Sequence, residues 1–239
     1  MARMRLQKFL SAAGVCSRRH GEQYILSGRV RVNSQVVSVL GTQVDPEKDR
    51  VEVDGRLVTI ENRAVYIALN KPKGYVTSCS HPGEPVVVDL VDLPQRLYPV
   101  GRLDKDSTGL LLLTNDGRLH HRLSHPSFDH EKEYEVTVER PIPDGALNQM
   151  AAGMMLRGAK TRPARVQRLS GHRFKIILLE GRNRQIRRMV RTLGHQVTRL
   201  KRIRVANIRL GNLPPGAWRH LTENEKKILV QSLEKPVQK

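Results

Sequence analysis

LYPVGRLDKDSTGLLLL, residues 97–113, is the stretch from which the fold and the chemistry of this chain are best predicted. Apolar residues stand on each side of a short polar loop, and the run from Leu110 to Leu113 is typical of a buried strand. The loop carries Asp104 and Asp106, although the chain as a whole is strongly basic. Flanking strands would hold such a carboxylate rigidly, and surplus positive charge would draw a polyanion toward it. An aspartate that only bonds its own turn is the simpler alternative.

The charge of the chain predicts a nucleic-acid partner. Its 239 residues include 42 Lys and Arg against 23 Asp and Glu, a net charge of +19, so phosphate backbones should bind to it in a salt-dependent way. A membrane-surface protein would need an amphipathic helix anchored by aromatic residues, which make up only 4% of the chain. No apolar run approaches the roughly 18 residues of a membrane-spanning helix. We therefore expect no membrane partner and a cytoplasmic protein.

Cofactor and metal chemistry leave no recognisable pattern in the sequence. A nucleoside-triphosphate enzyme would have a GxxxxGK[ST] loop and a dinucleotide enzyme a strand followed by GxGxxG, and neither is present. Cys16 and Cys79 have no CxxC partner, so we expect two reduced packing residues. No cofactor and no metal are expected, because the histidine spacings do not match zinc motifs. The histidines considered, which should face RNA or solvent, are His120, His121, His125 and His130.

Apolar patterns divide the chain into a small domain, residues 1–62, and a larger one, residues 63–239. The small domain has two short helical patterns followed by strand-like pieces. Ser17 can cap the second helix, which should end before Gly28. Seven of the first 31 residues are Arg or Lys and only Glu22 is acidic. This imbalance predicts a phosphate-binding face rather than an ordinary solvated helix face.

In the larger domain, strand-like runs alternate with helical stretches and turns, which predicts an α+β fold built on a mixed, mainly antiparallel sheet. The expected strands lie at residues 65–69, 110–113, 134–138 and 174–179. Residues 115–117 should form the turn that closes the leucine strand, and a helix is expected at residues 145–156. Thr222 and Glu225 form a capping box that should begin a C-terminal helix.

A helix around Arg187 should have one apolar face and one cationic face. Its apolar residues, at spacings of three and four, are Ile186, Met189, Val190 and Leu193. Its cationic residues are Arg184, Arg187, Arg188 and Arg191. Residues 181–209 contain ten Arg or Lys and no acid, which is unlike the mixed charge of a merely solvated surface. We therefore expect a groove that binds a polyanion.

The loop around Asp104 resembles the catalytic motif of pseudouridine synthases, specifically the RsuA family, whose members act on ribosomal RNA. The resemblance covers nearly the whole chain, because three further motifs follow in the expected order and spacing. These motifs are NKPKG at residues 70–74, EKEY at residues 131–134 and EGRNRQIRRM at residues 180–189. The first domain resembles the S4 RNA-binding domain, on SRR at residues 17–19 and GRV at residues 28–30. Within the family, residues 101–107, 130–134 and 215–222 are most similar to the RluB and RluF group, which acts on large-subunit RNA.

The resemblance implies a catalytic set of Asp104, Tyr134 and Arg187. Asp104 would act as nucleophile or initiating base, Tyr134 would stack on the target uracil, and Arg187 would pair with Asp104 and hold it ionised. The implied partner is ribosomal RNA, most similar to the 23S case, bound by a monomer. The residues expected to bind RNA are Arg5, Lys8, Ser17, Arg18, Arg19, Arg29, Arg102, Arg184 and Arg188.

Pseudouridine formation suits such a set because it needs no cofactor. The bond between C1′ and N1 of uridine breaks, the base turns, and C5 joins C1′; Tyr134 or a water could remove the C5 proton. The main alternative is a noncatalytic RNA-binding protein of ribosome assembly, which would need no acid in a cationic cleft. A DNA-binding regulator is disfavoured because the sequence has no convincing recognition helix or dimerisation heptads.

Overall fold

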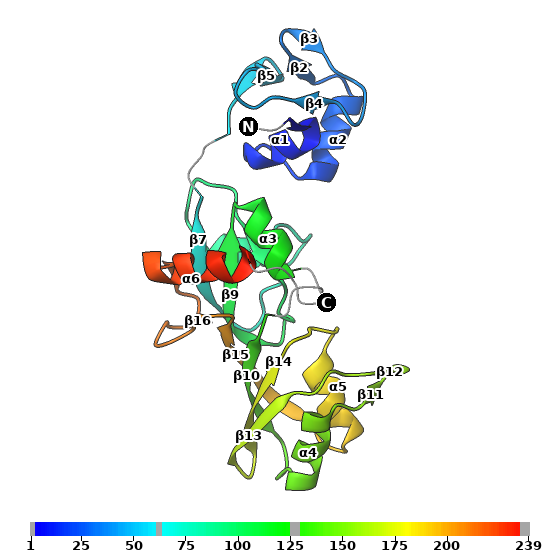
Figure 1. The fold of residues 1–239 in the computed structure, drawn as a ribbon, viewed down its shortest axis with the longest axis vertical. Coiled ribbons are helices and arrows are strands. Elements are labelled where there is room, and N and C mark those ends of the chain that lie inside the picture. Colours follow the sequence, from blue (N-terminus) through cyan, green and yellow to red (C-terminus); the bar gives the residue numbers. More distant parts are fainter. Residues whose placement is uncertain (1–2, 61–63, 125–129, 235–239) are drawn as a thin grey trace. The chain divides into compact units, whose positions relative to one another are not determined.

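The structure is a computed structural model that describes residues 3–60, 64–124 and 130–234 (Figure 1). The chain folds into two compact units, one of Met1–Ala64 with Pro94–Arg96 and one of Val65–Leu93 with Leu97–Lys239. The predicted domain boundary falls on residues 61–63, which lie outside the described residues. None of the helices in the described part has the length and apolarity that crossing a membrane would need.

The first unit combines two short helices with a small antiparallel sheet. Helix α1 spans Leu6–Ala12 and α2 spans Arg18–Leu26, as predicted. The sheet has the order β3-β2-β5-β6, with strands Gln35–Val36, Val30–Val32, Val51–Val53 and Arg56–Val58; β1 (Met4–Arg5) pairs separately with β4 (Gln43–Val44). The hydroxyl oxygen of Ser17 accepts the N–H of His20 at 3.2 Å, which confirms the predicted helix cap. The unit's core is an apolar cluster that includes Leu6, Leu10 and Ile25.

The second unit is built on a nine-stranded mixed sheet, which confirms the predicted α+β class. Its main path has the order β13-β14-β10-β15-β9-β7-β17. The strands along that path are Arg165–Ser170, Arg173–Leu178, Lys132–Val138, Val197–Val205, Thr108–Thr114, Tyr66–Lys71 and Trp218–His220. Beside it, β8 (Tyr98–Val100) pairs with β9, and β16 (Ile208–Arg209) pairs with β15. The pairs along the path are antiparallel except β9 with β15, so the sheet is mainly antiparallel, as expected.

The leucine strand β9 is buried on both of its faces. Leu111 and Leu113 belong to the larger apolar cluster, to which α4 (Asp144–Ala152) and α5 (Gln185–Thr192) also contribute. Leu110 and Leu112 belong to a second cluster, to which α3 (Gly117–Ser124) and α6 (Glu223–Glu234) contribute. A continuous apolar run instead of alternation is what a strand covered on both faces requires. This position makes β9 a rigid support for the loop that precedes it.

Two helix predictions need correction. The helix expected at residues 145–156 ends at Ala152, and Met155–Leu156 is instead strand β11, which pairs with β12 (Ala159–Lys160). Gly153 explains the early end, because its φ of +83° leaves the helical region and a Cβ there would overlap the carbonyl oxygen of Thr161. The turn expected at residues 115–117 closes β9 but continues directly into α3, a helix that was not predicted.

The N-termini of α3 and α6 are capped by side chains. Asp116 accepts the N–H of Arg118 at 2.8 Å, which supplies the start of α3. Before α6, Glu225 accepts the N–H of Thr222 at 2.9 Å and donates its own N–H to the hydroxyl of Thr222 at 3.2 Å. This reciprocal pair confirms the predicted capping box. The described part also contains one short 3-10 helix, η1, at Val87–Leu90.

Candidate active site

The loop of residues 101–107, called the aspartate loop, joins β8 to β9. These strands pair antiparallel with Val100 opposite Leu112, which confirms the predicted loop between two strands. Gly109 follows the loop with a φ of +105°, and a Cβ there would overlap the backbone of Arg202 on β15. Only glycine permits this close approach of β15 to the base of the loop.

The NKPKG segment holds the aspartate loop from one side. Lys71 is fully buried at the end of β7, and its ammonium group donates hydrogen bonds to the carbonyl oxygens of Pro72 at 3.0 Å, Ser107 at 2.9 Å and Lys105 at 3.5 Å. Burial lowers the pKa of Lys71 to about 8, although the two loop carboxylates oppose this shift. A cation thus satisfies backbone carbonyls of the loop without a close carboxylate partner.

Thr77 provides a second attachment for the loop. Its hydroxyl donates to the carbonyl oxygen of Leu103 at 2.7 Å and lies 3.2 Å from the N–H of the same residue. The N–H of Gly74 donates to the carbonyl oxygen of Lys105 at 2.9 Å. Leu103 itself is buried in the larger apolar cluster. The backbone on both sides of Asp104 is therefore fixed by hydrogen bonds and packing.

Asp104 and Tyr134 line one cavity of about 270 Å³. Tyr134 lies on β10, opposite Ile176 of β14 and Arg202 of β15, and is only 8% exposed. The side chain of Asp104 is 30% exposed. Residues 181–186 also contribute to the wall, so the strand motif, the aspartate loop and the segment before α5 meet here. The volume is near the lower end of small-molecule pockets, which span about 300–1,000 Å³.

The ion pair expected between Arg187 and Asp104 is replaced by a different one. Arg187 lies 3.3 Å from a carboxylate oxygen of Asp106, and it also donates to the carbonyl oxygen of Asp106 at 3.1 Å and the hydroxyl of Ser107 at 3.3 Å. The cation nearest to Asp104 is Arg184, with 3.5 Å between Nη1 and Oδ2. The difference arises because Asp106, two residues further along the loop, faces α5, where Arg187 lies.

Asp106 is the carboxylate that binds the arginines of this segment. Arg184 donates two hydrogen bonds to it, one to each carboxylate oxygen, both at 3.1 Å. Burial raises the pKa of Asp106, but the hydrogen bonds from Arg184 and the charges of Arg187 and Arg184 outweigh it and leave the pKa below its ordinary value. Burial lowers the pKa of Arg187, against the pull of Asp106. The sequence pattern did not identify Asp106, although its place in the aspartate loop was a signal.

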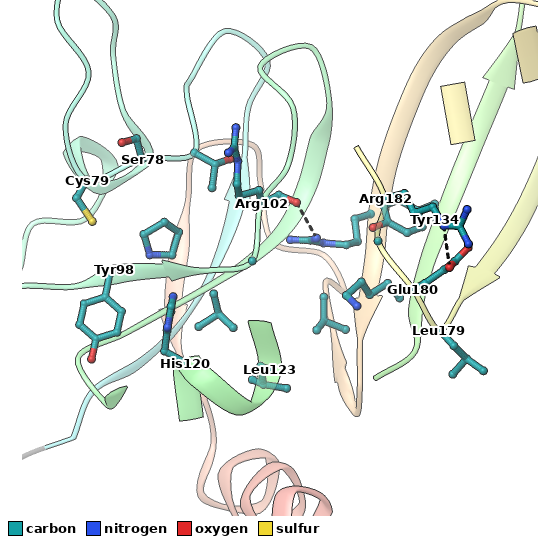
Figure 2. Close-up of a pocket in the computed structure, with 18 residues that line it drawn as sticks. Ser78, Cys79, Tyr98, Arg102, His120, Leu123, Tyr134, Leu179, Glu180 and Arg182 are labelled. Atoms are coloured by element: carbon teal, nitrogen blue, oxygen red, sulfur yellow. Dashed lines mark hydrogen bonds and ion pairs between the residues drawn. The ribbon is translucent and has the colours of Figure 1, made fainter. Parts of the chain in front are cut away.

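A second, larger cavity of about 880 Å³ shares Arg102, Tyr134 and Arg182 with the first. Figure 2 shows Tyr98, His120 and Cys79 on one side of it and Tyr134, Glu180 and Arg182 on the other. The rings of Tyr98 and His120 meet edge to face with their centres 5.1 Å apart. Arg102 lines both cavities, so an extended ligand could run from one to the other.

Comparison with known proteins decides the family. The sequence matches the RNA pseudouridylate synthase family over residues 65–192 and the S4 domain over residues 4–51. It is 42% identical over 224 residues to the dual-specificity RNA pseudouridine synthase RluF of Escherichia coli strain K12, covering 93% of this chain and 77% of that protein. This chain belongs to the RNA pseudouridylate synthase family. As a pseudouridine synthase, it is an isomerase that converts uridine to pseudouridine in RNA.

Two further relatives agree with this assignment. Ribosomal large subunit pseudouridine synthase B of Bacillus subtilis is 42% identical over 233 residues, covering 94% of this chain and 95% of that protein. A crystal structure described as a pseudouridylate synthase has a TM-score of 0.70 and 33% identity, covering 95% of this chain and 99% of that one. The predicted family and fold of both domains are thereby confirmed.

The residues predicted to bind RNA in the first unit of the synthase are mostly exposed. Four are cations on its surface, namely Arg5, Lys8, Arg18 and Arg19, and Ser17 is the helix cap described above. Arg29 is also exposed, but its guanidinium pairs with both carboxylate oxygens of Asp54 and lies 3.9 Å from the ring centre of Tyr24. Arg29 is therefore already engaged within its own unit.

The cationic stretch of residues 181–209 is less open than its composition suggested. Arg202 is 2% exposed and donates to the carbonyl oxygens of Leu110 at 2.7 Å and Arg102 at 3.3 Å. Arg204 is paired with Glu131 and Glu133 at 2.9 and 2.8 Å. These two arginines support the sheet, so they do not form part of a free cationic surface. Arg184, by contrast, is exposed, and Arg188 is half-buried and donates to the side chain of Asn183.

Three side-chain predictions concern residues away from the loop. Cys16 is buried, as expected, but Cys79 is exposed and lines the larger cavity. His130 is buried, which corrects the expectation that it faces RNA or solvent, whereas His121 is exposed. His125 lies outside the described residues. In the part of the chain that the structure describes, no group of three His, Cys, Asp or Glu residues is placed to hold a metal ion.

Proposed function

We propose that this pseudouridine synthase modifies a uridine of large-subunit ribosomal RNA, with Asp104 as the reactive carboxylate. The observation that carries the proposal is the cavity that Asp104 shares with Tyr134. A carboxylate and an aromatic ring on its wall are the groups needed to react with a nucleotide and to hold its base. The substrate class is supported by the Bacillus subtilis relative, whose name assigns it to the ribosomal large subunit.

The reaction requires that the uridine leave its stack and enter the cavity. Tyr134 supplies a flat face for the uracil, and stacking of this kind contributes about 1 to 3 kcal/mol per base. Asp104 then acts at C1′ or at the uracil ring, the bond between C1′ and N1 breaks, and C5 joins C1′ after the base has turned. The proton on C5 leaves to Tyr134 or to a water. RNA that covers the partly exposed Asp104 would strengthen its interactions with nearby charges.

The remaining expectations concern partner, state and place. The exposed cations of the first unit are proposed to bind the RNA backbone, in keeping with its match to the S4 domain. The enzyme is proposed to act as a monomer in the cytoplasm, since the residues around Asp104 all come from one unit of one chain. Light scattering of the purified protein, with and without RNA, tests the monomer.

The division at residue 62 is also a proposal, which truncation tests. A chain of residues 63–239 should fold, because the second unit has its own apolar clusters, and it should bind RNA less tightly than the full chain. Its thermal unfolding and its affinity for a ribosomal RNA fragment measure both expectations. Insolubility of this chain would overturn the division.

Asp104→Asn is the decisive variant. Purified protein should form pseudouridine at a specific site in large-subunit RNA from cells that lack this enzyme, as mapped by carbodiimide modification and primer extension. Asp104→Asn should form none while keeping its fold and RNA affinity, because it removes the charge and changes little volume. Asp92→Asn is the matched control, since Asp92 is an exposed carboxylate outside the cavities. Turnover by Asp104→Asn, or modification of small-subunit RNA only, would contradict the proposal.

A further inference from the structure

We propose that Asp106 is a positioning residue that keeps Arg184 from closing onto Asp104, an inference that rests on the proposed role of Asp104. Two carboxylates compete for one guanidinium in the aspartate loop. Arg184 binds Asp106 with two hydrogen bonds of 3.1 Å, whereas its distance to Asp104 is 3.5 Å. Charge-assisted hydrogen bonds are normally about 2.7–2.9 Å long, so Asp104 is near a positive charge without being bound by it.

Asp106 is placed to act through Arg184 rather than on the substrate. Asp104, Ser107 and Arg184 line the 270 Å³ cavity, and Asp106 is absent from its described wall. Arg187 approaches Asp106 as well, at 3.3 Å, and its side chain is only 12% exposed. Asp106 therefore joins two arginines behind the cavity. Its pKa lies below the ordinary value, so the carboxylate stays charged at neutral pH.

The backbone of Arg184 makes this restraint necessary. Arg184 is the residue before α5 and has φ +51° and ψ +35°, a left-handed conformation that non-glycine residues adopt at a cost. Its side chain is 40% exposed, so packing alone does not determine where the guanidinium points. The two hydrogen bonds to Asp106 fix the plane of the guanidinium, because a fork of two N–H groups can bind both oxygens of only one carboxylate at a time.

Loss of Asp106 should release Arg184 toward Asp104. A guanidinium bound through two hydrogen bonds would stabilise the ionised form of Asp104 and lower its reactivity as nucleophile or base. Other charged or titratable groups around Asp104 are Lys71 from β7, Arg102 and Lys105 from the loop, Tyr134 from β10, Arg182 from the segment before α5, and Arg187 and Arg188 from α5. Among the described cations, only Arg184 lies within ion-pair distance of Asp104.

The test compares single-turnover rates of Asp106→Asn, Arg184→Gln and the double variant, at saturating protein, over a range of pH. The RNA is the fragment of large-subunit RNA that the unmodified protein converts. Asp106→Asn should lower the plateau rate about 10- to 100-fold, as misplacement of a reacting group does. It should also shift the acid limb of the profile to lower pH, because Asp104 holds its charge more strongly.

The double variant separates positioning from a general structural defect. Removing Arg184 from Asp106→Asn should raise the rate to that of Arg184→Gln alone and move the acid limb back up, since no guanidinium is left to capture Asp104. A structural defect would instead make the two losses add and leave the acid limb unmoved, and that result would overturn the inference. Asp92→Asn, with a carboxylate removed outside both cavities, should keep the rate and the profile of the unmodified protein.

Two further variants keep the test decisive. If Asp106→Asn does not fold, as judged by thermal unfolding, Asp106→Glu replaces it, because glutamate keeps the charge but displaces both oxygens. Its rate should fall, and adding Arg184→Gln should restore the rate to that of Arg184→Gln alone; additive losses would again overturn the inference. Asp104→Asn separates the two levels of argument. Activity in Asp104→Asn removes the proposed function itself, whereas an inactive Asp104→Asn with additive losses at Asp106 and Arg184 removes only this inference.

Discussion

The two units of the synthase use arginine in different ways. In the first unit, Arg18 and Arg19 are exposed on the first turn of α2. In the second unit, Arg187 and Arg202 are nearly buried and donate to carbonyl oxygens and to a loop carboxylate. An exposed arginine binds phosphate with little effect on its neighbours, whereas a buried one holds other groups in place. Changes in the first unit should therefore alter RNA affinity, and changes in the second should alter stability and rate.

The largest expected effect is on the base of the aspartate loop. Gly109→Ala should lower the free energy of unfolding by about 4 kcal/mol, because the new methyl group would overlap the backbone of Arg202 at a φ that alanine avoids. Chemical denaturation measures this loss. Gly145→Ala is the control: Gly145 lies in α4 with open space around it, so stability should stay equal or rise by up to about 1 kcal/mol. Equal stability of both variants would mean that β15 and the loop are not closely packed.

Lys71→Met should have the next largest effect. It leaves three backbone carbonyl oxygens without their buried donor, so the free energy of unfolding should fall by about 2 to 4 kcal/mol. The difference should also depend on pH. Because the pKa of Lys71 is about 8 when folded and ordinarily 10.5, the unfolded chain binds this proton more tightly between those values.

The sign of that pH dependence follows from the lowered pKa. The charged, buried ammonium costs stability below pH 8, and the cost disappears as the pH rises through the interval from 8 to 10.5. The unmodified protein should gain stability over this interval relative to Lys71→Met. Urea unfolding of both proteins at a series of pH values measures the difference. A constant difference would show that Lys71 keeps an ordinary pKa in the folded chain.

A comparison of two arginines of α5 tests positioning against binding. Arg187→Ala should lower the single-turnover rate about 10- to 100-fold, since it removes the link between the aspartate loop and the start of β15. Arg191→Ala should weaken RNA binding and leave the saturated rate unchanged, because Arg191 is exposed at the end of the same helix. Rates and affinities measured on one RNA fragment distinguish the two. Equal, small effects would show that Arg187 is not needed to hold the loop.

The smallest effect is expected in the first unit. Replacing Arg18 and Arg19 by glutamine should weaken RNA binding and flatten the slope of log affinity against log salt by about 0.7 to 0.9 for each phosphate that is no longer neutralised. Arg29→Gln should change the slope less, because Asp54 and Tyr24 already occupy its guanidinium. Filter binding over a salt series measures both slopes. A larger change for Arg29→Gln would mean that its ion pair opens when RNA binds.

Local sequence patterns predicted much of the fold. The leucine run, the helix caps at Ser17 and Thr222 and the apolar face of α5 were correct, because each depends on residues within one or two turns of each other. The errors arose where distant contacts decide. The helix α4 ends early because of a hairpin that packs against Gly153, and no pattern within the helix reports that contact.

By itself, the sequence determined the family, the basic character and the loop in which Asp104 lies, because motif order, composition and turn residues are properties of the chain. Only the tertiary structure decided which charges meet. It placed Tyr134 beside Asp104, buried Arg202, and assigned Arg184 and Arg187 to Asp106 rather than to Asp104. The physical reason is that ion pairing depends on distances of a few ångströms between residues far apart in the chain, and a net charge or a spacing carries no such distances.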